Sequence, residues 1–185
     1  MWATLSAATQ CHLGPTIDGF RARSAGALRR ELAPFAHEKV RIFLEEQTDV
    51  DLAVEGISGG AAVYAAAFRY EQGGWYVAID PSLRIQATLP RPGSRIFQRT
   101  KVLAEIVARV PVTSASVWFD GSFFPAEGAR TDAEHAGVLG EAPQPLRSGR
   151  HIVVAFATAG ESAAARAWSF TSYGGPYRGS LAPYG

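Results

Sequence analysis

The sequence predicts an α+β protein that is mainly β, with an antiparallel meander packed by one or two helices and followed by a small β-sandwich portion. Of its 185 residues, 47% are hydrophobic and 19% are charged, a composition that supplies a sizeable core and argues against disorder over most of the chain. Short β-branched or aromatic runs separated by glycine-rich turns are typical of antiparallel strands. A single cysteine, Cys11, excludes an internal disulfide framework.

The first half of the chain is predicted to hold one helix and four strands. Residues 1–19 show no clear period and are expected to form an irregular lead-in. Apolar side chains recur at helical spacing over residues 20–36, where Pro34 ends the pattern. Apolar or aromatic residues then alternate in four short segments, and glycine-containing turns separate the last three of them. The predicted strands cover residues 39–45, 50–57, 62–71 and 75–80.

An amphipathic helix is predicted after this meander. Pro90 and Pro92 interrupt the chain, Ser94 is a suitable N-cap, and the helix is expected to run to about Arg109, just before Pro111. One face of this helix should pack on the sheet. The stripe that predicts it consists of Ile96, Thr100, Leu103, Val107 and Val110.

The C-terminal third is predicted to be β again. A strand over residues 114–119 ends in the turn pair Asp120-Gly121, and strands over residues 151–157 and 163–171 flank a tight turn. Residues 122–150, rich in Gly, Pro, Ala and charge, are expected to form a long loop. The predicted divisions are a lead-in at 1–19, an α+β region at 20–112, a β region at 113–172 and a tail at 173–185.

Three short motifs in this third resemble one family. They are Ser116–Gly121 (Ser-Val-Trp-Phe-Asp-Gly), Pro145–Val154, and Ala167–Thr171 (Ala-Trp-Ser-Phe-Thr). Over about residues 114–172 the chain is similar to bacterial immunoglobulin-like domains. The resemblance implies a β-sandwich and a role in adhesion or assembly, with no catalytic residue. The Asp…Gly-Asn turn that usually precedes the family's last strand is replaced here by Thr158–Ser162.

The charge balance narrows the classes of partner. The chain has 18 basic and 17 acidic residues and a formal net charge of +1, which disfavours a strongly basic nucleic-acid-binding protein. No acidic residue lies between Asp80 and Glu105, so the stretch from Arg84 to Lys101 has a local positive potential. This stretch is either a solvated helix face or a surface that faces an anionic partner. Its candidate partner-binding residues are Arg91, Arg95 and Arg99.

One pattern is compatible with catalysis. Gly56–Gly60 reads Gly-Ile-Ser-Gly-Gly and matches the Gly-x-Ser-x-Gly nucleophile elbow, with Ser58 as nucleophile. Asp120 and His151 follow in the order Ser…Asp…His. The elbow requires a helix after the serine, whereas the aromatic residues after Ser58 alternate as they do in a strand. A small serine hydrolase that uses Ser58, Asp120 and His151 is therefore an alternative function.

No cofactor and no metal ion are expected. The four histidines are dispersed without a tight metal-ligand spacing, and the glycine pairs lack a phosphate-binding pattern. A second alternative is a small-ligand-binding module with an aromatic pocket. That pocket would be lined by Tyr64, Phe68, Trp75 and Trp118.

The C-terminal tail predicts a role in binding other proteins, because Tyr and Arg are enriched at interface hot spots. Its candidate partner-binding residues, set among glycines and prolines, are Tyr173, Tyr177, Arg178 and Tyr184. The preferred function is a non-catalytic accessory or structural subunit of a larger assembly, such as a phage particle, a secretion machine or the face of a membrane complex. The N-terminus lacks the basic region of a secretory signal, and no apolar run reaches the roughly 18–20 residues of a membrane span. We therefore expect the cytoplasm, or the cytoplasm-side face of an assembly.

Overall fold

The computed structural model is mainly β, with a few short helices near the N-terminus. It describes residues 2–23, 25–32, 40–47, 50–59, 62–97, 100–120, 122–124, 127–130, 135–142 and 146–173. The helices are η1 (Trp2–Thr4), α1 (Ala7–Leu13), α2 (Ile17–Arg23) and α3 (Ala25–Leu32). The first strands are β1 (Val40–Gln47), β2 (Val50–Gly59), β3 (Ala62–Glu71), β4 (Gly74–Ala78), β5 (Leu83–Leu89) and β6 (Arg95–Phe97). They are followed by β7 (Lys101–Ala108), β8 (Val112–Phe119), β9 (Ser122–Phe124), β10 (Glu127–Arg130), β11 (His135–Glu141), β12 (Gly149–Ala159) and β13 (Ser162–Tyr173).

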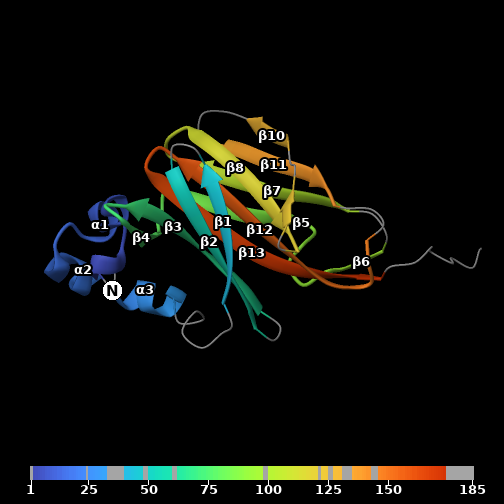
Figure 1. Cartoon of the computed structure of the whole chain (residues 1–185), viewed down its shortest axis with the longest axis horizontal. Helices are drawn as coiled ribbons and strands as arrows, with labels where there is room; N and C mark the ends of the chain where they lie inside the picture. Colours follow the sequence, from blue (N-terminus) through green and yellow to red (C-terminus); the bar gives the residue numbers. More distant parts are fainter. Residues whose placement is uncertain are drawn as a thin grey trace, which may run out of the picture.

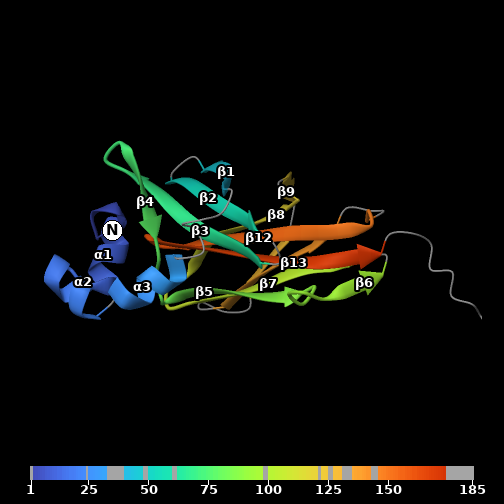
Figure 2. The same ribbon diagram turned by 90° about the horizontal axis from the view of Figure 1, so that it is seen from below.

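The strands form three sheets stacked in three layers. The meander sheet has the order β1-β2-β3-β4, the back sheet β10-β11-β7-β5, and the central sheet β6-β13-β12-β8-β9. Neighbouring strands are antiparallel except that β6 pairs in parallel with the end of β13. Figure 2 shows the central sheet between the other two, so its strands are covered on both faces over part of their length.

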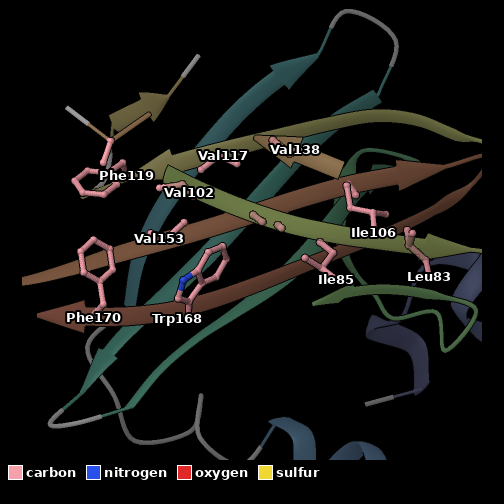
Figure 3. Close-up of a cluster of buried hydrophobic side chains, with 14 of the residues drawn as sticks. Leu83, Ile85, Val102, Ile106, Val117, Phe119, Val138, Val153, Trp168 and Phe170 are labelled. Carbon is pink, nitrogen blue, oxygen red and sulfur yellow. The ribbon is translucent and has the colours of Figure 1, made fainter. Parts of the chain in front are cut away.

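The main core lies between the back sheet and the central sheet (Figure 3). Buried aliphatic residues from both sheets meet there beside Trp168 and Phe170 of β13. Each fully buried large apolar side chain stabilises the fold by roughly 1.5–3 kcal/mol. The large members of this cluster are Leu83, Ile85, Val102, Ile106, Val117, Phe119, Val138, Val153, Trp168 and Phe170.

A second core joins the central sheet to the meander sheet. Val154 and Phe156 of β12 pack there against Ala67 of β3 and Ala78 of β4. Because side chains alternate along a strand, the odd-numbered neighbour Val153 faces the main core instead. Small alanine side chains allow the two sheets to approach closely at this contact.

The N-terminal helices cover β4 at one end of the molecule (Figure 1). Leu5, Phe20 and Leu28 are buried against Val77. The backbone N–H of Ser6 donates to the Val77 carbonyl at 2.9 Å. The Ser6 hydroxyl also caps α1, because it accepts from the Thr9 backbone N–H. Among the described residues, no helix has the length and apolar character that crossing a membrane requires.

Gly14, which follows α1, has a φ of +148° and lies against α2. A Cβ at this position would be 2.6 Å from the Phe20 backbone nitrogen. We expect Gly14→Ala to lower the free energy of unfolding by more than about 2 kcal/mol, measured by thermal unfolding. Gly26 of α3 is the matched control, because a Cβ there meets nothing within 4 Å. Gly26→Ala should stabilise by about 0.5–1 kcal/mol, and equal effects of the two changes would contradict the prediction.

Several predicted strands are confirmed. The segments 39–45, 50–57, 62–71 and 75–80 correspond to β1–β4, which form the predicted antiparallel meander. The segments 114–119, 151–157 and 163–171 correspond to β8, β12 and β13, with a tight turn at Gly160-Glu161.

The predicted helix over residues 94–109 is wrong. The described part of this stretch forms β6 and β7. In β7 the residues Val102, Ala104 and Ile106 are buried at a spacing of two, and both neighbouring strands, β5 and β11, bond to it. Pairing on both sides therefore overrides the helical spacing of the apolar residues.

Three further expectations are corrected. Residues 122–150 hold β9, β10 and β11, where a long loop was expected. The expected lead-in over 1–19 holds η1, α1 and the start of α2, and the expected helix over 20–36 is divided between α2 and α3. The expected boundary at 112–113 falls after the first residue of β8, whose sheet packs against the sheet that contains β7.

Candidate functional site

An exposed pair of aromatic rings lies where β6 and β13 end, at the opposite end of the molecule from the helices (Figure 1). Phe97 and Tyr173 are partners in the parallel β6–β13 ladder. Their ring centroids are 5.2 Å apart with planes inclined by 26°, a stacked geometry. Phe97 is 62% exposed and Tyr173 is 41% exposed. This pair is the largest exposed aromatic surface at this end among the described residues.

The turn before β6 is bonded to β13 and carries exposed arginines on the segment that leads to Phe97. The Gly93 N–H donates to the Ser169 carbonyl at 2.7 Å, and the Thr171 N–H donates to the Ser94 carbonyl at 2.9 Å. These bonds hold the turn against β13, and Arg91 and Arg95 on either side of it are exposed. We call Arg91, Arg95, Phe97 and Tyr173 the aromatic end.

Three of the predicted partner-binding residues lie on β13 and on the segment bonded to it: Tyr173 ends β13, Arg95 pairs with Thr171, and Arg91 lies in the preceding turn. Phe97 completes the surface and was not predicted, because its segment was expected to be helical. The other predicted residues lie outside the described residues; they are Arg99, Tyr177, Arg178 and Tyr184.

A polar cluster inside the sandwich contains two residues of the predicted catalytic alternative. His151, at the start of β12, donates from Nδ1 to Oδ2 of Asp120 at 2.7 Å. The second carboxylate oxygen, Oδ1, accepts from the Ile152 backbone N–H at 2.8 Å. On the other side of the ring, Nε2 lies 2.8 Å from the Arg147 carbonyl and 3.0 Å from Oγ of Ser172.

The direction of these hydrogen bonds does not suit nucleophilic catalysis. A general base must accept the serine proton on an unprotonated nitrogen. Here Nε2 of His151 faces the Arg147 carbonyl, which can only accept a hydrogen bond and so has no proton to give to a base. The Ser172 hydroxyl donates to the same Arg147 carbonyl, so its proton points away from the histidine.

Burial gives this cluster a structural role. His151 is 6% exposed and Ser172 is 1% exposed. The imidazole lies between Phe119 and Phe170, with ring centroids 5.3 Å from each. The cluster ties together the end of β8, the start of β12 and the end of β13, and it leaves no space for a substrate beside Ser172.

Ser58, the predicted nucleophile, lies in another layer. It is in β2 of the meander sheet, where its ladder partner is Val63 of β3. Residues 62–71 form a strand, whereas a nucleophile elbow requires a helix after the serine. Neither Asp120 nor His151 belongs to this sheet: Asp120 follows β8 and His151 lies in β12, both strands of the central sheet.

The described residues of the predicted aromatic pocket lie in different surroundings. Trp75 lies at the β3–β4 hairpin, packed edge-on against Tyr70 with ring centroids 5.3 Å apart, and both are exposed. Trp118 packs in the core between the central and meander sheets. Phe68 is half-buried on β3, and the side chain of Tyr64 is outside the described part.

The hollow that the structure does contain is lined mostly by alanines. It encloses about 870 Å³ between β13, β5 and the β3–β4 pair, and we call it the alanine groove. Its lining residues are Val63, Ala65, Ala66, Ala67, Ala78, Ile79, Asp80, Leu83, Arg84, Ile85, Gln86, Ala87, Ala163, Ala164, Ala165, Arg166 and Ala167.

Within the described ranges, no three His, Cys, Asp or Glu side chains gather in a way that could hold a metal ion. In comparisons with known proteins, no family model and no curated protein sequence matches this chain. The geometry of the described residues therefore carries the functional proposals.

Proposed function

We propose that this protein is a non-catalytic accessory subunit that binds another protein through the aromatic end. The stacked, exposed Phe97–Tyr173 pair is the observation that supports this proposal. Large aromatic rings and arginines are the residues most enriched at the energetic centre of protein interfaces. Arg91 and Arg95 are exposed on the segment that leads to Phe97 and would donate hydrogen bonds to carboxylate or carbonyl groups of a partner.

The strand order supports the resemblance to immunoglobulin-like domains. In that fold, strands ordered A-B-E-D pack on strands ordered C-F-G. The same order results here when β5, β7, β11 and β10 are taken as A, B, E and D, and β8, β12 and β13 as C, F and G. Because this fold hosts many functions, the binding role rests on the aromatic end and not on the strand order.

The aromatic end is tested by replacing both of its rings. In the double variant Phe97→Ser/Tyr173→Ser, we expect the recovery of co-purifying proteins from the source cells to fall at least tenfold, measured by quantitative mass spectrometry. The expected loss follows from removing the two rings that would be buried at the interface.

The chain offers a matched control in its other exposed aromatic pair. Tyr70→Ser/Trp75→Ser removes a similar exposed aromatic surface at the β3–β4 hairpin and should leave the recovery unchanged. Equal losses in both double variants, or no loss in either, would overturn the proposal.

The contribution of the tail is measured by truncation after Tyr173. A cut before Ser172 is unsuitable, because that residue is buried and bonds to the Arg147 carbonyl. If the tail contributes to the same interface, removal of residues 174–185 lowers recovery of the same proteins that the ring variant loses.

A further inference from the structure

The alanine groove runs along a strand edge that has no neighbouring strand among the described residues. In the central sheet, β13 pairs with β12 along its whole length, but its other edge pairs with β6 only at Thr171–Tyr173. The remaining part of this edge, at Ala163–Ala167, forms one side of the groove. An open edge of this kind is the template on which an added strand pairs.

Two backbone hydrogen bonds show which groups of β13 point to that edge. The Ser169 carbonyl and the Thr171 N–H both bond to the turn before β6, and so they face away from β12. Backbone groups of a strand point to the same edge at every second residue. The N–H and C=O groups of Ala163, Ala165 and Ala167 therefore face the groove.

The walls of the groove suit an inserted strand. The meander sheet lies on one side, with Ala65 and Ala67 on the groove wall, and β5 of the back sheet lies on the other. Alanine side chains leave room for the side chains of an incoming segment. A volume of about 870 Å³ is within the usual range for sites that bury a whole ligand.

The edge of β5, on the opposite wall, is already covered. Arg166 of β13 donates from its guanidinium to the Ile85 carbonyl at 3.2 Å. A cation placed at a strand edge opposes pairing with another strand. The groove therefore presents the β13 edge, rather than the β5 edge, for pairing.

The charges in and beside the groove are basic. Arg84 lines the groove and also lines an adjoining hollow of about 280 Å³ together with Arg109. Within the described residues, Arg84, Arg109 and Arg166 form no ion pair with a carboxylate. Asp80 also lines both hollows, and its carboxylate, which accepts from Ser82 and from the Ser162 hydroxyl, offsets one of these positive charges. Three arginines against this one carboxylate leave an excess of positive charge.

We propose that the alanine groove binds an extended peptide segment of a partner protein, which pairs as an added strand with the open edge of β13 and places an acidic side chain against Arg84. This mode is β-strand addition, in which backbone hydrogen bonds give affinity and side-chain pockets give specificity. The groove shares no residue with the aromatic end, so the two surfaces are tested independently.

The probe is a phage-displayed library of random nine-residue peptides, selected on the full-length protein. We expect the selected pool to be enriched in β-branched residues with at least one Asp or Glu. The best selected peptide should lose at least tenfold in affinity for Arg84→Glu, measured by fluorescence polarisation. Arg91→Glu, also at an exposed arginine but in the aromatic end, should bind it as tightly as the original protein does.

A second variant tests the backbone pairing itself. Ala165→Pro removes an N–H that faces the groove and keeps the β12 ladder, because proline is tolerated where a strand's N–H points outward. Ala165→Pro should lose peptide binding while its Tm stays within a few degrees. If this variant does not fold, the same test is made with a peptide that is N-methylated at alternate residues, which should bind the original protein more weakly than the unmodified peptide does. The proposal is overturned by a selected pool without enrichment, by a peptide that binds Arg84→Glu as tightly as the original protein, or by an N-methylated peptide that binds as tightly as the unmodified one.

Discussion

Replacing Phe156 by alanine is expected to lower the free energy of unfolding by about 3–5 kcal/mol. Phe156 is 0% exposed and packs in the core between the central and meander sheets. The surrounding residues include Ala67, Ala78 and Ala163, whose side chains are too short to fill the space that the ring leaves. The measurement is equilibrium unfolding in urea, followed by tryptophan fluorescence.

The number of steps in the urea unfolding curve of Phe156→Ala shows whether the sheets unfold together. Because β12 belongs to both cores, we expect Phe156→Ala to shift one cooperative transition to lower urea. Ile17→Ala, at an exposed position on α2, is the control and should change stability by less than about 0.5 kcal/mol. A first transition that moves while a second stays in place would show that the meander sheet unfolds independently of the sandwich.

Replacing His151 by alanine is expected to cost about 3 kcal/mol, because it removes a buried ring together with its hydrogen bonds. Oδ2 of Asp120 loses its bond to Nδ1, and the Arg147 carbonyl keeps only the Ser172 hydroxyl. The gap between Phe119 and Phe170 adds a cavity to this loss. Chemical unfolding of the purified variant gives the magnitude.

Ser172→Ala is the control for this cluster, because it removes a smaller group and should lower the free energy of unfolding less. It removes one hydroxyl that donates to the Arg147 carbonyl, and Nε2 of His151 still lies 2.8 Å from that oxygen. A loss of about 1 kcal/mol is therefore expected for Ser172→Ala, clearly less than for His151→Ala. Equal losses, or an unchanged stability in His151→Ala, would refute the structural role given to the cluster.

The strands were predictable from sequence where polar and apolar residues alternate, or where glycines mark the turns, as in β3 and β4. The helix predicted over 94–109 failed for a physical reason that lies in β7. Its buried residues alternate at Val102, Ala104 and Ile106, but Leu103 and Val107 on the opposite face are also half-buried and apolar. A strand with two apolar faces has no alternation in its polarity, so a helical stripe can be drawn through the same residues.

The candidate site was predictable only in part. Arg91, Arg95 and Tyr173 were identified by residue type, but their positions on neighbouring segments depend on the parallel pairing of β6 with the end of β13. Likewise, the contact between Asp120 and His151 depends on the β8–β12 ladder. Such pairings join segments far apart in the chain, and no local pattern encodes them. Ser172 had a usable signal, because it continues the buried alternation of Trp168 and Phe170.

The burial of β12 on both faces affects what fixes the register in which it pairs with its neighbouring strands. A polar face normally opposes a one-residue slip, because the slip would bury that face. In β12 both faces are apolar, so a slip would bury no polar face and would be opposed there only by the different sizes of residues such as Val153 and Phe156. Two features at the strand ends oppose the slip as well: His151 is bonded to Asp120 at one end, and the turn at Gly160, with φ +58°, fixes the other. The His151–Asp120 bond and the Gly160 turn therefore favour one strand register over others that also bury apolar residues. They make the fold more specific as well as more stable.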